Sequence, residues 1–309
     1  MRICSFLPSA TEILCAIGLQ DAIVGISFEC DYPPEVRSKP VVVYTRLLPS
    51  LGPAEIDREV NETVRQGKSL YWIEIEKLKQ IQPDLILTQD LCHVCAASSD
   101  DLRAATTVLS PRTRVISLSP HRLADIWKNI LTVGEATRRQ AEAAILVERL
   151  KQRIEKVQKA LAGVVARPRV LCLEWLDPPF IAGHWVPEMV ELAGGTDVMG
   201  RSGEPGFPTS WDVVLRADPE IIVIMPCGYD LERNTKELSS FGFPAGWNDL
   251  RAVRSGRVFA VNSSGYYSRP GPRVATGAEM LASIIHPGRV SGDLPAGAIA
   301  TVNKHASAA

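Results

Sequence analysis

One long segment in the middle of the chain constrains the fold more than any other feature. From Gly134 to Leu161 it contains no proline and no internal glycine, and it is rich in Ala, Glu, Lys, Arg and Leu. Apolar residues follow one another along it with helical spacing: Ala141, Ile145, Leu146, Leu150, Ile154, Val157 and Leu161. A helix of this length would run about 40 Å, the width of a domain or more. We therefore expect a folded part on each side of one long helix.

The sequence before this segment alternates between short β-rich runs and helical patterns. The strands expected here are residues 2–7, 22–27, 84–88 and 114–119. Helices are expected over residues 11–17 and 100–105, and a third is expected to start at Ser119 and Pro120. Alternation of this kind is typical of a parallel sheet covered by helices.

The same pattern starts again after the long helix. Strands are expected over residues 169–175, 220–225 and 257–262, with helices starting near Pro187 and Ser210 and a closing helix from Arg273 to Ile285. The fold class is thus α/β, with two Rossmann-like parallel-sheet lobes, one bridging helix and a ligand cleft between the lobes. The expected divisions are a first lobe (1–122), a linking helical segment (123–162), a second lobe (163–289) and a flexible tail (290–309).

Composition excludes several classes of function. Hydrophobic residues make up 46% of the 309 residues and charged residues 22%, as in a soluble globular protein. The formal net charge of −1 provides no general attraction for nucleic acid or an anionic membrane. No run approaches the roughly 20 apolar residues of a membrane-spanning helix. We therefore expect that the protein neither binds nucleic acid nor inserts into a membrane.

The beginning of the chain and its cysteines favour the cytoplasm. The start, "MRICSFLPSATEILCAIG", is a poor signal peptide because Pro8, Ser9, Thr11 and Glu12 interrupt its apolar run. Seven cysteines, an odd number, do not resemble a disulfide framework. The localisation expected is cytoplasmic, or periplasmic if a leader has been removed.

Polar and aromatic residues collect where strands end, which is where open parallel sheets bind ligands. In the first lobe Phe28 and Tyr32 follow one strand, and "QDLCHVC" (89–95), with Gln89, Cys92 and Cys95, follows another. In the second lobe the candidates are Glu174, Trp175, His184, Trp185, Cys227, Tyr229, Tyr266, Tyr267 and Arg269. Aromatics make up only 6% of the chain, so this clustering predicts a large, flat, partly apolar ligand.

Each of these features also has a simpler structural interpretation. "SATE" (Ser9 to Glu12) is a capping-box sequence, so Ser9 is expected to close the start of a helix. His184 is expected to be a polar pocket or loop residue, with an axial metal contact as the alternative.

The Cys92–Cys95 pair leaves several readings open. There is no second CxxC and no HxxxH to complete a structural zinc site. The pair also does not open a long helix as a thioredoxin-like motif does. A composite site with His184, Glu174 or Cys227 would favour zinc or copper(I). The remaining interpretation is that the cysteines line a pocket or are small buried side chains.

Enzyme motifs are missing from the sequence. It contains no GxSxG, GxxxxGK[ST] or HExxH, and no glycine-rich dinucleotide fingerprint follows the first strand. We expect a protein that is not an enzyme and requires no cofactor. An enzyme on a binding-protein scaffold, dependent on a residue such as Glu174, is the less favoured alternative.

Several stretches resemble one family. "SFLPSATEILCAIGLQDAIVGISFECDYP", "LKQIQPDLIL", "DPPFIAGHWVPEMVELAGG", "VVLRADPEIIVI" and "YYSRPGPR" resemble the cobalamin-binding branch of the helix-linked substrate-binding proteins of ABC transporters. The likeness covers roughly residues 2 to 286. Siderophore and haem binders share much of this framework, so the motifs identify the superfamily better than the ligand.

The resemblance implies roles for particular residues. It implies a corrinoid such as cobalamin held mainly by aromatic and backbone contacts, with Phe28 and Tyr32 in the first lobe. Tyr266, Tyr267 and Arg269 are the matching residues of the second lobe. Glu76 and Asp212 match, by their spacing to "PDL" and "DPE", the acids with which the family docks to a membrane permease. With Thr209, Asp212 has helix capping as its alternative role.

The sequence departs from the family pattern in three places. We expect no leader of the kind that an exported binding protein needs. An insertion (44–72) separates the second and third strand units, and the chain carries "QDLCHVC" where exported relatives need no such cysteine pair. The alternative functions are therefore a thiol-based zinc or copper protein that uses Cys92 and Cys95, or a binder of another metal chelate.

Overall fold

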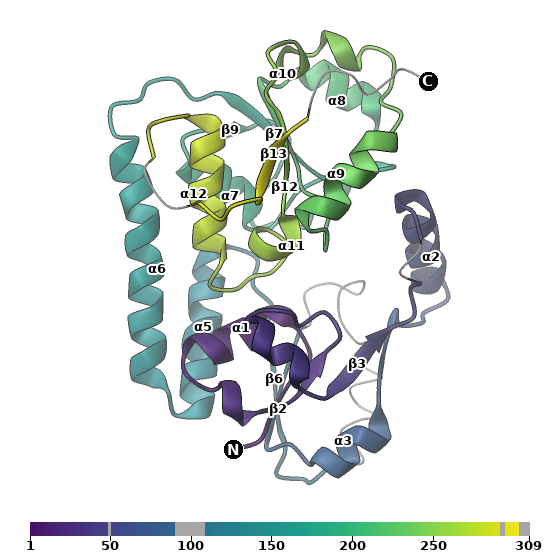
Figure 1. Cartoon of the computed structure of the whole chain (residues 1–309), viewed down its shortest axis with the longest axis vertical. Coiled ribbons are helices and arrows are strands. Elements are labelled where there is room, and N and C mark those ends of the chain that lie inside the picture. The colour runs from purple at the N-terminus through teal and green to yellow at the C-terminus, as the bar shows by residue number, and fades with distance from the viewer. Residues whose placement is uncertain (49–50, 90–108, 291–293, 303–309) are drawn as a thin grey trace. The chain divides into compact units, whose positions relative to one another are not determined.

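The computed structural model describes residues 1–48, 51–89, 109–290 and 294–302, and these residues fold into two compact units (Figure 1). The first unit comprises Met1–Pro120 and Ala124–Glu148, and the second comprises His121–Leu123 and Arg149–Ala309. The expected α/β fold in two parts is confirmed.

The first unit is built on a six-stranded sheet in the order β4-β3-β2-β1-β5-β6. Its strands are β1 (Ile3–Ser5), β2 (Ile23–Ser27), β3 (Val41–Thr45), β4 (Tyr71–Ile73), β5 (Leu85–Thr88) and β6 (Arg114–Ser117). All pairs are parallel except β3 with β4. The parallel strands therefore all end at one edge of the sheet, which we call the first carboxyl edge.

Helices connect and cover these strands. Among the described residues of the first unit, the α-helices are α1 (Pro8–Ala16), α2 (Pro53–Arg65), α3 (Ile75–Ile81) and α5 (Leu123–Thr137), with 3₁₀ turns at Gln20–Ala22 and Pro34–Ser38. A buried apolar cluster of Cys4, Phe6, Val42, Ile86 and neighbouring side chains fills the space between sheet and helices.

The second unit contains a seven-stranded sheet whose main path runs β10-β8-β7-β11-β12-β13. Its strands are β7 (Arg169–Leu176), β8 (Pro179–Ile181), β9 (Thr196–Asp197), β10 (Phe207–Pro208), β11 (Ile221–Ile224), β12 (Val258–Val261) and β13 (Ile299–Thr301). The central strands β7, β11 and β12 are parallel, and they end at what we call the second carboxyl edge.

The helices of the second unit flank these central strands. They are α7 (Val186–Leu192), α8 (Trp211–Ala217), α9 (Leu231–Ser240), α10 (Arg251–Arg254), α11 (Ser263–Tyr266) and α12 (Val274–Ile285), with a 3₁₀ turn at Trp247–Asp249. Strand β11 is buried along its whole length because its Ile and Val side chains pack against elements on both faces.

The long central helix is shorter than the sequence predicts. Helix α5 ends at Thr137, Arg138 adopts a left-handed conformation with φ 61°, and α6 then runs over Gln140–Ala160. At 1.5 Å per residue α6 is about 31 Å long. The expected linking segment 123–162 is also divided differently, since α5 belongs to the first unit and α6 passes from the first to the second at Glu148 and Arg149.

The expected flexible tail contains a strand. Residues 299–301 form β13, which pairs antiparallel with β12 through Phe259↔Thr301 and Val261↔Ile299. The expectation of a loose segment over 290–309 is therefore wrong for these residues. The expected helix 100–105 lies outside the described residues.

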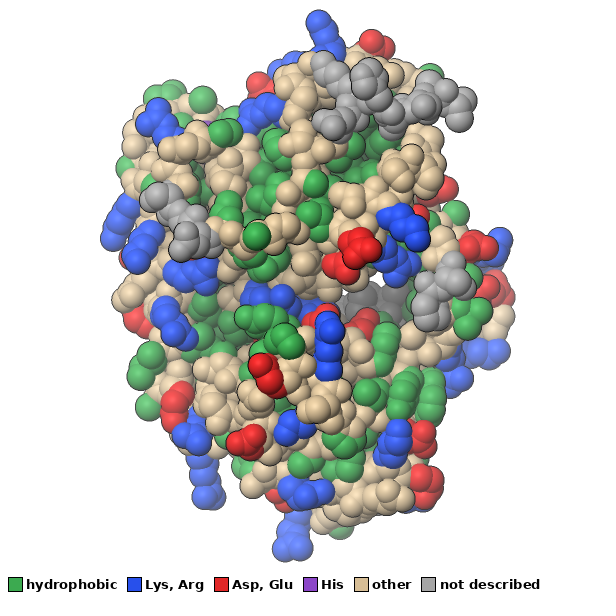
Figure 2. All heavy atoms as spheres, in the orientation of Figure 1, with side chains coloured by type: hydrophobic (Ala, Val, Ile, Leu, Met, Phe, Trp, Pro, Cys, Tyr) green, Lys and Arg blue, Asp and Glu red, His purple; other side chains and the backbone are tan. Residues whose placement is uncertain are grey.

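Charged side chains of both signs are interspersed over the face of the molecule drawn in Figure 2, as the net charge of −1 predicts. Among the described residues, no helix combines the length and the apolar character needed to cross a membrane.

Candidate functional site

The first carboxyl edge begins with the tight connection from β1 to α1. Leu7 is the N-cap of α1, Pro8 occupies its first turn, and no side-chain hydrogen bond caps the helix. The capping-box prediction for Ser9 is wrong because proline at the first turn moves the helix start back to Pro8. Ser9 is buried, at 3% exposed.

Two aromatic residues project from the loop after β2. Phe28 is 41% exposed and Tyr32 45% exposed, although both are large rings. The backbone N–H of Phe28 donates to the Val43 carbonyl at 3.0 Å, and its ring lies 6.2 Å from the Tyr71 ring. The edge of the sheet thus holds Phe28 in place while leaving much of its ring uncovered.

The cysteine motif lies almost entirely outside the described residues. Gln89 is half-buried directly after β5, whereas Cys92 and Cys95 are not described. The described cysteines are free thiols. Burial raises the pKa of Cys4 to about 12, and burial followed by the charge of Glu12 raises that of Cys15 to about 11. In the described part of the chain, no three His, Cys, Asp or Glu side chains gather to hold a metal ion.

The second carboxyl edge carries an aromatic wall formed by Trp175 and Tyr229. Their rings meet edge to face with centroids 5.4 Å apart, and the Arg233 guanidinium lies 4.1 Å above the Tyr229 ring. Burial raises the pKa of Tyr229, and the charge of Arg233 opposes part of that shift. The Trp175 Nε1 is buried and has no hydrogen-bond partner among the described residues. Tyr229 is only 3% exposed, so the accessible ring surface of this wall belongs to the half-buried Trp175.

Glu174 and Cys227 lie next to the wall. The backbone N–H of Cys227 donates to the Glu174 carbonyl at 3.2 Å, so the end of β7 is tied to the loop after β11. A Cβ atom on Gly206 would approach the Glu174 Oε2 to 2.8 Å, which places that carboxylate against the backbone of the β8–β10 region. Cys227 itself is exposed.

The loops after β11 and β12 are cross-linked by hydrogen bonds. The Ser263 hydroxyl interacts with the carbonyls of Pro226 and Tyr229, and the Ser264 N–H donates to the Tyr229 carbonyl at 2.9 Å. The Gly228 N–H donates to the Ser268 Oγ at 3.3 Å. These bonds fix Tyr229 relative to the segment that carries Tyr266 and Arg269.

The two tyrosines of the segment 266–273 differ in how deeply they are buried. Tyr266 is half-buried, and the Arg273 guanidinium lies 5.5 Å from its ring centroid. Arg269 is also half-buried. Tyr266 and Arg269 thus keep accessible surface at the second carboxyl edge.

Trp185 and Tyr267 lie in the interior of the second unit instead. They are 4% and 2% exposed. The Trp185 Nε1 donates to the Tyr267 carbonyl at 2.9 Å, and the Tyr267 hydroxyl donates to the Gly277 carbonyl at 3.1 Å. In this structure neither side chain offers surface to a ligand, because both complete the packing beneath α12.

His184 adopts a left-handed backbone conformation with φ 52°. Its N–H donates to the Glu204 carbonyl at 2.6 Å, and its own carbonyl accepts from Gly203 at 2.9 Å. Its ring lies 5.6 Å from the His121 ring and 5.7 Å from that of Trp185. Burial, and then the charge of His121, lower the pKa of His184. This environment favours the neutral imidazole of a structural loop residue.

Sequence reasoning missed two polar residues of α9. Arg233 caps the Tyr229 ring, and Asn234, which is fully buried, donates through Nδ2 to the carbonyls of Ile224 and Val261 at 2.9 and 3.0 Å. Asn234 thereby joins the ends of β11 and β12. The only sign of these residues in the sequence was the helical pattern that begins after Asp230. In the structure the Asp230 side chain accepts a hydrogen bond from the Arg233 N–H.

The two acids assigned to docking occupy matching positions in two matching helices. Helices α3 and α8 each end in a left-handed residue, Gln82 with φ 45° and Asp218 with φ 40°. A proline, an acid and a buried strand follow in both cases. Counted back from those residues, Glu76 and Asp212 stand at the same position, and both are exposed.

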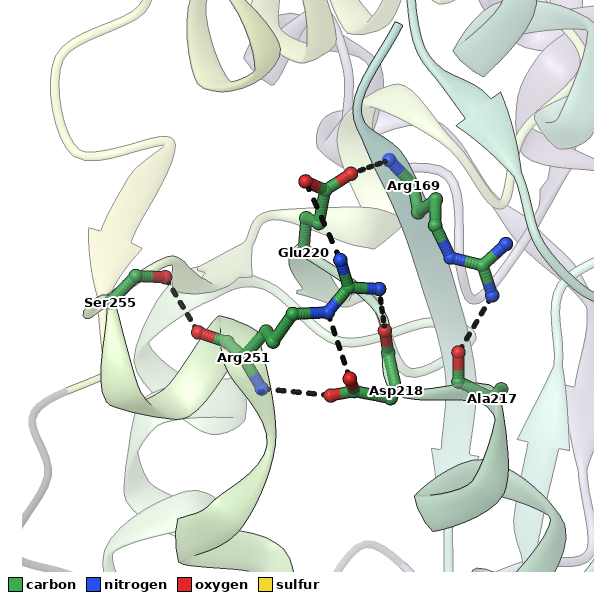
Figure 3. A network of polar contacts seen from close by, with 6 residues as sticks. All are labelled: Arg169, Ala217, Asp218, Glu220, Arg251 and Ser255. Atoms are coloured by element: carbon green, nitrogen blue, oxygen red, sulfur yellow. Dashed lines mark hydrogen bonds and ion pairs between the residues drawn. The ribbon is translucent and has the colours of Figure 1, made fainter.

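The hydrogen bonds after these helices also match. In the first unit, the Arg2 N–H donates to Asp84 and the Arg2 side chain donates to a carbonyl at the end of α3. In the second, the Arg169 N–H donates to Glu220 at 2.8 Å and its side chain to the Ala217 carbonyl at 2.7 Å (Figure 3). Arg2 immediately precedes β1, and Arg169 is the first residue of β7. Helices α3 and α8 therefore both end at the edge of their sheet that lies opposite the carboxyl edge.

The junction in the second unit contains an additional ion-pair network. Arg251 donates to the Asp218 carboxylate through Nε at 2.8 Å and lies 3.7 Å from the Glu220 carboxylate (Figure 3). The hydrogen bonds from Arg251 lower the pKa of Asp218. Asp212 is in the first turn of α8, where an acid is favourable, but Ser210 is the N-cap and no side chain caps the helix. The alternative capping role with Thr209 is not observed.

Comparison with known proteins identifies relatives of the whole chain. The family described as "Periplasmic binding protein" matches residues 3–264. An uncharacterized ABC transporter substrate-binding lipoprotein of Bacillus subtilis is 24% identical, over 93% of this chain and 80% of its own length. A vitamin B12-binding protein of Vibrio cholerae is 23% identical, over 92% and 88% of the two chains.

Solved structures share the fold. A periplasmic haem-binding protein from Pseudomonas aeruginosa superposes with a TM-score of 0.73 at 19% sequence identity, covering 95% of this chain and 96% of the other.

Proposed function

Because the chain belongs to the periplasmic binding protein family, we propose that it is a non-catalytic binder of a corrinoid, serving an ABC transporter as its substrate-binding component. The observation that carries this proposal is the half-buried ring of Trp175 at the second carboxyl edge, which packs edge to face against the buried ring of Tyr229. The partly uncovered rings of Phe28 and Tyr32 at the first carboxyl edge add to it. A large macrocycle with apolar faces suits such surfaces.

The polar groups beside the wall suit a corrinoid. The buried Trp175 Nε1 lies without a partner among the described residues, and a buried donor gains most from a ligand acceptor. The peripheral amide groups of a corrinoid supply such acceptors. Relatives named as vitamin B12-binding and cobalamin-binding proteins support this choice of ligand.

Haem and siderophores are the competing ligands, since solved neighbours include haem-binding proteins. One titration distinguishes them: purified protein is mixed with cobalamin, cobinamide and haem, and tryptophan fluorescence and the visible spectrum are recorded. We expect saturable binding of both corrinoids and weaker binding of haem. Tighter haem binding, or no binding of any of the three, would contradict the proposal.

Two variants connect the binding to the proposed surfaces. Phe28→Ala and Trp175→Ala should each weaken cobalamin binding at least tenfold, because each removes most of a ring contact. Trp211→Ala is the matched control, since Trp211 belongs to a separate aromatic cluster with Phe243 and Trp247. An equal loss in the control would show that the effect is not local.

We also propose that Glu76 and Asp212 contact basic residues of a transporter permease. Their matching positions and exposure support this role, as does their placement on helices that end opposite the carboxyl edges. Glu76 already forms a 2.7 Å ion pair with Lys79 and is 72% exposed, so a partner would compete with that lysine. Glu76→Lys and Asp212→Lys should leave the ligand titration unchanged and reduce corrinoid uptake by cells that depend on this protein.

A further inference from the structure

Strand β7 carries an extra residue where it reaches the second carboxyl edge. Leu173 pairs with Ile181 of β8, whereas Trp175 pairs with Phe180, so two steps along β7 correspond to one step along β8. Glu174 is therefore the bulged residue of this antiparallel pair. Bulges of this kind bend a strand and redirect its side chains, and they are over-represented beside functional sites.

The carboxylate of Glu174 lies against a backbone that has no side chain at the point of contact. A Cβ atom on Gly206 would come within 2.8 Å of the Glu174 Oε2 and within 2.7 Å of the Ile181 carbonyl oxygen. A larger residue at position 206 would thus displace the carboxylate, and glycine leaves room for it. The Glu174 side chain is half-buried, so it keeps accessible surface beside the half-buried ring of Trp175.

The loop 201–206, which contributes this contact, is itself held by other parts of the second unit. The His184 N–H donates to the Glu204 carbonyl at 2.6 Å. Arg122, which also belongs to the second unit, donates to the Ser202 hydroxyl and to the Ser202 carbonyl, each at 3.0 Å. These bonds hold the loop in place, and with it the surface against which the carboxylate lies.

We infer that Glu174 determines specificity in the ligand site: its negative charge selects a corrinoid whose peripheral groups are neutral amides over one that carries carboxylates. This inference rests on the proposed function. An amide N–H donates a hydrogen bond to a carboxylate. A ligand carboxylate beside Glu174 would instead place two like charges together at a half-buried position, where salt screens them poorly. The same repulsion disfavours metal chelates with carboxylate groups, such as haem.

The test compares cobalamin with its monocarboxylic acids, in each of which one peripheral amide has been hydrolysed, at about pH 7.5 so that the acid is ionised. At least one of these acids should bind the unaltered protein about tenfold more weakly than cobalamin. In Glu174→Gln the same acid should bind about fivefold more tightly than before, because the repulsion is removed. Cobalamin should bind this variant about two- to fivefold more weakly, because a neutral amide oxygen is a weaker acceptor than a carboxylate.

Glu204→Gln is the matched control. It removes a carboxylate from the adjoining loop, but the Glu204 side chain is 60% exposed and paired with Arg201 at 3.4 Å. Because exposed charges are well screened, neither affinity should change by more than about twofold.

A second measurement uses the unaltered protein and so does not depend on how a variant folds. Titration calorimetry in buffers that differ in ionisation enthalpy should show proton uptake when the disfavoured acid binds, because two carboxylates that share a site resist being ionised together. Cobalamin should bind without proton uptake. Equal binding of cobalamin and every acid, the same discrimination in Glu174→Gln, an equal change in the Glu204→Gln control, or no proton uptake would overturn the inference while leaving the proposed function intact. If the unaltered protein does not bind cobalamin, both fall together.

Discussion

Burial separates the side chains that hold the second unit together from those that face outward. Trp185 and Tyr267 belong to the first group, since their hydrogen bonds end on the Tyr267 and Gly277 carbonyls. Their closeness in sequence to His184 and Tyr266 made them resemble ligand contacts. Trp185 is tied to Tyr267, which lies far from it along the chain, so sequence proximity could not show that these rings are covered.

Tyr267→Phe should lower the free energy of unfolding by about 1–2 kcal/mol, because the buried Gly277 carbonyl loses its donor. Urea denaturation measures this loss. Cobalamin affinity should stay unchanged. Tyr32→Ala should do the reverse, weakening binding with little effect on stability, because Tyr32 is 45% exposed. If Tyr267→Phe lowered cobalamin affinity without lowering stability, Tyr267 would have to be counted among the ligand-binding residues.

His184 should make the native state sensitive to mild acid. Its pKa is lowered in the folded protein, first by burial and then by His121, so the unfolded chain binds a proton more readily. Stability is therefore lost as pH falls below the unfolded value of about 6.5 toward the folded pKa.

His184→Asn should remove part of that loss. Asparagine tolerates the left-handed backbone at this position, so the variant isolates the titration. Urea denaturation at about pH 7.5 and about pH 5.5 should show a smaller difference for the variant than for the unaltered protein. The same difference in both proteins would mean that His184 does not titrate in this range.

Secondary structure that depends on local patterns was predictable, and structure that depends on distant contacts was not. Buried Val and Ile runs predicted β1, β5, β7, β11 and β12 because such strands are apolar on both faces. The break between α5 and α6 lies among good helix formers. It is explained by the close approach of the two helices, since a Cβ on Gly134 would come within 2.4 Å of the Ala143 Cβ.

The residues of the candidate site can also be separated into those set by local sequence and those set by distant contacts. Counting residues from the strand ends predicted positions near the carboxyl edges for Phe28, Trp175 and Tyr229, because topology alone decides such positions. Asn234 and Arg233 were missed because α9 brings them back to strands from which they are separated in sequence. Their contributions are visible only once the helix is packed.

One ion pair fastens α6 to the second unit. Arg153 donates to Glu279 of α12 through Nε at 2.9 Å and also contacts the second oxygen, and it reaches Thr276 Oγ1 at 2.8 Å. Glu279→Gln should cost about 1–3 kcal/mol, because the pair is bidentate and partly buried. Glu155→Gln is the control on the same helix, where an exposed pair with Lys159 predicts a loss below about 0.5 kcal/mol. Equal losses in urea denaturation would argue against this fastening role.

For the whole molecule, α6 is the helix that both units share, passing between them at Glu148 and Arg149. Arg149→Pro should break it there, at a cost of about 3 kcal/mol in helix stability. We expect the free energy of unfolding to fall by a similar amount although neither carboxyl edge is altered. Arg149→Ala is the control, since Arg149 is exposed and alanine preserves the helix. Equal stabilities of the two variants in urea denaturation would show that an unbroken α6 is not required.

Strand β13 has a practical consequence for anyone who shortens this chain. Its backbone covers one side of β12 through three residue pairs, and Ala298 just before it is buried. A truncation that stops after α12 would leave β12 as a bare edge with unpaired amides and carbonyls. Such edges recruit strands from other molecules, so the shortened protein should aggregate even though every residue assigned to ligand contact is retained.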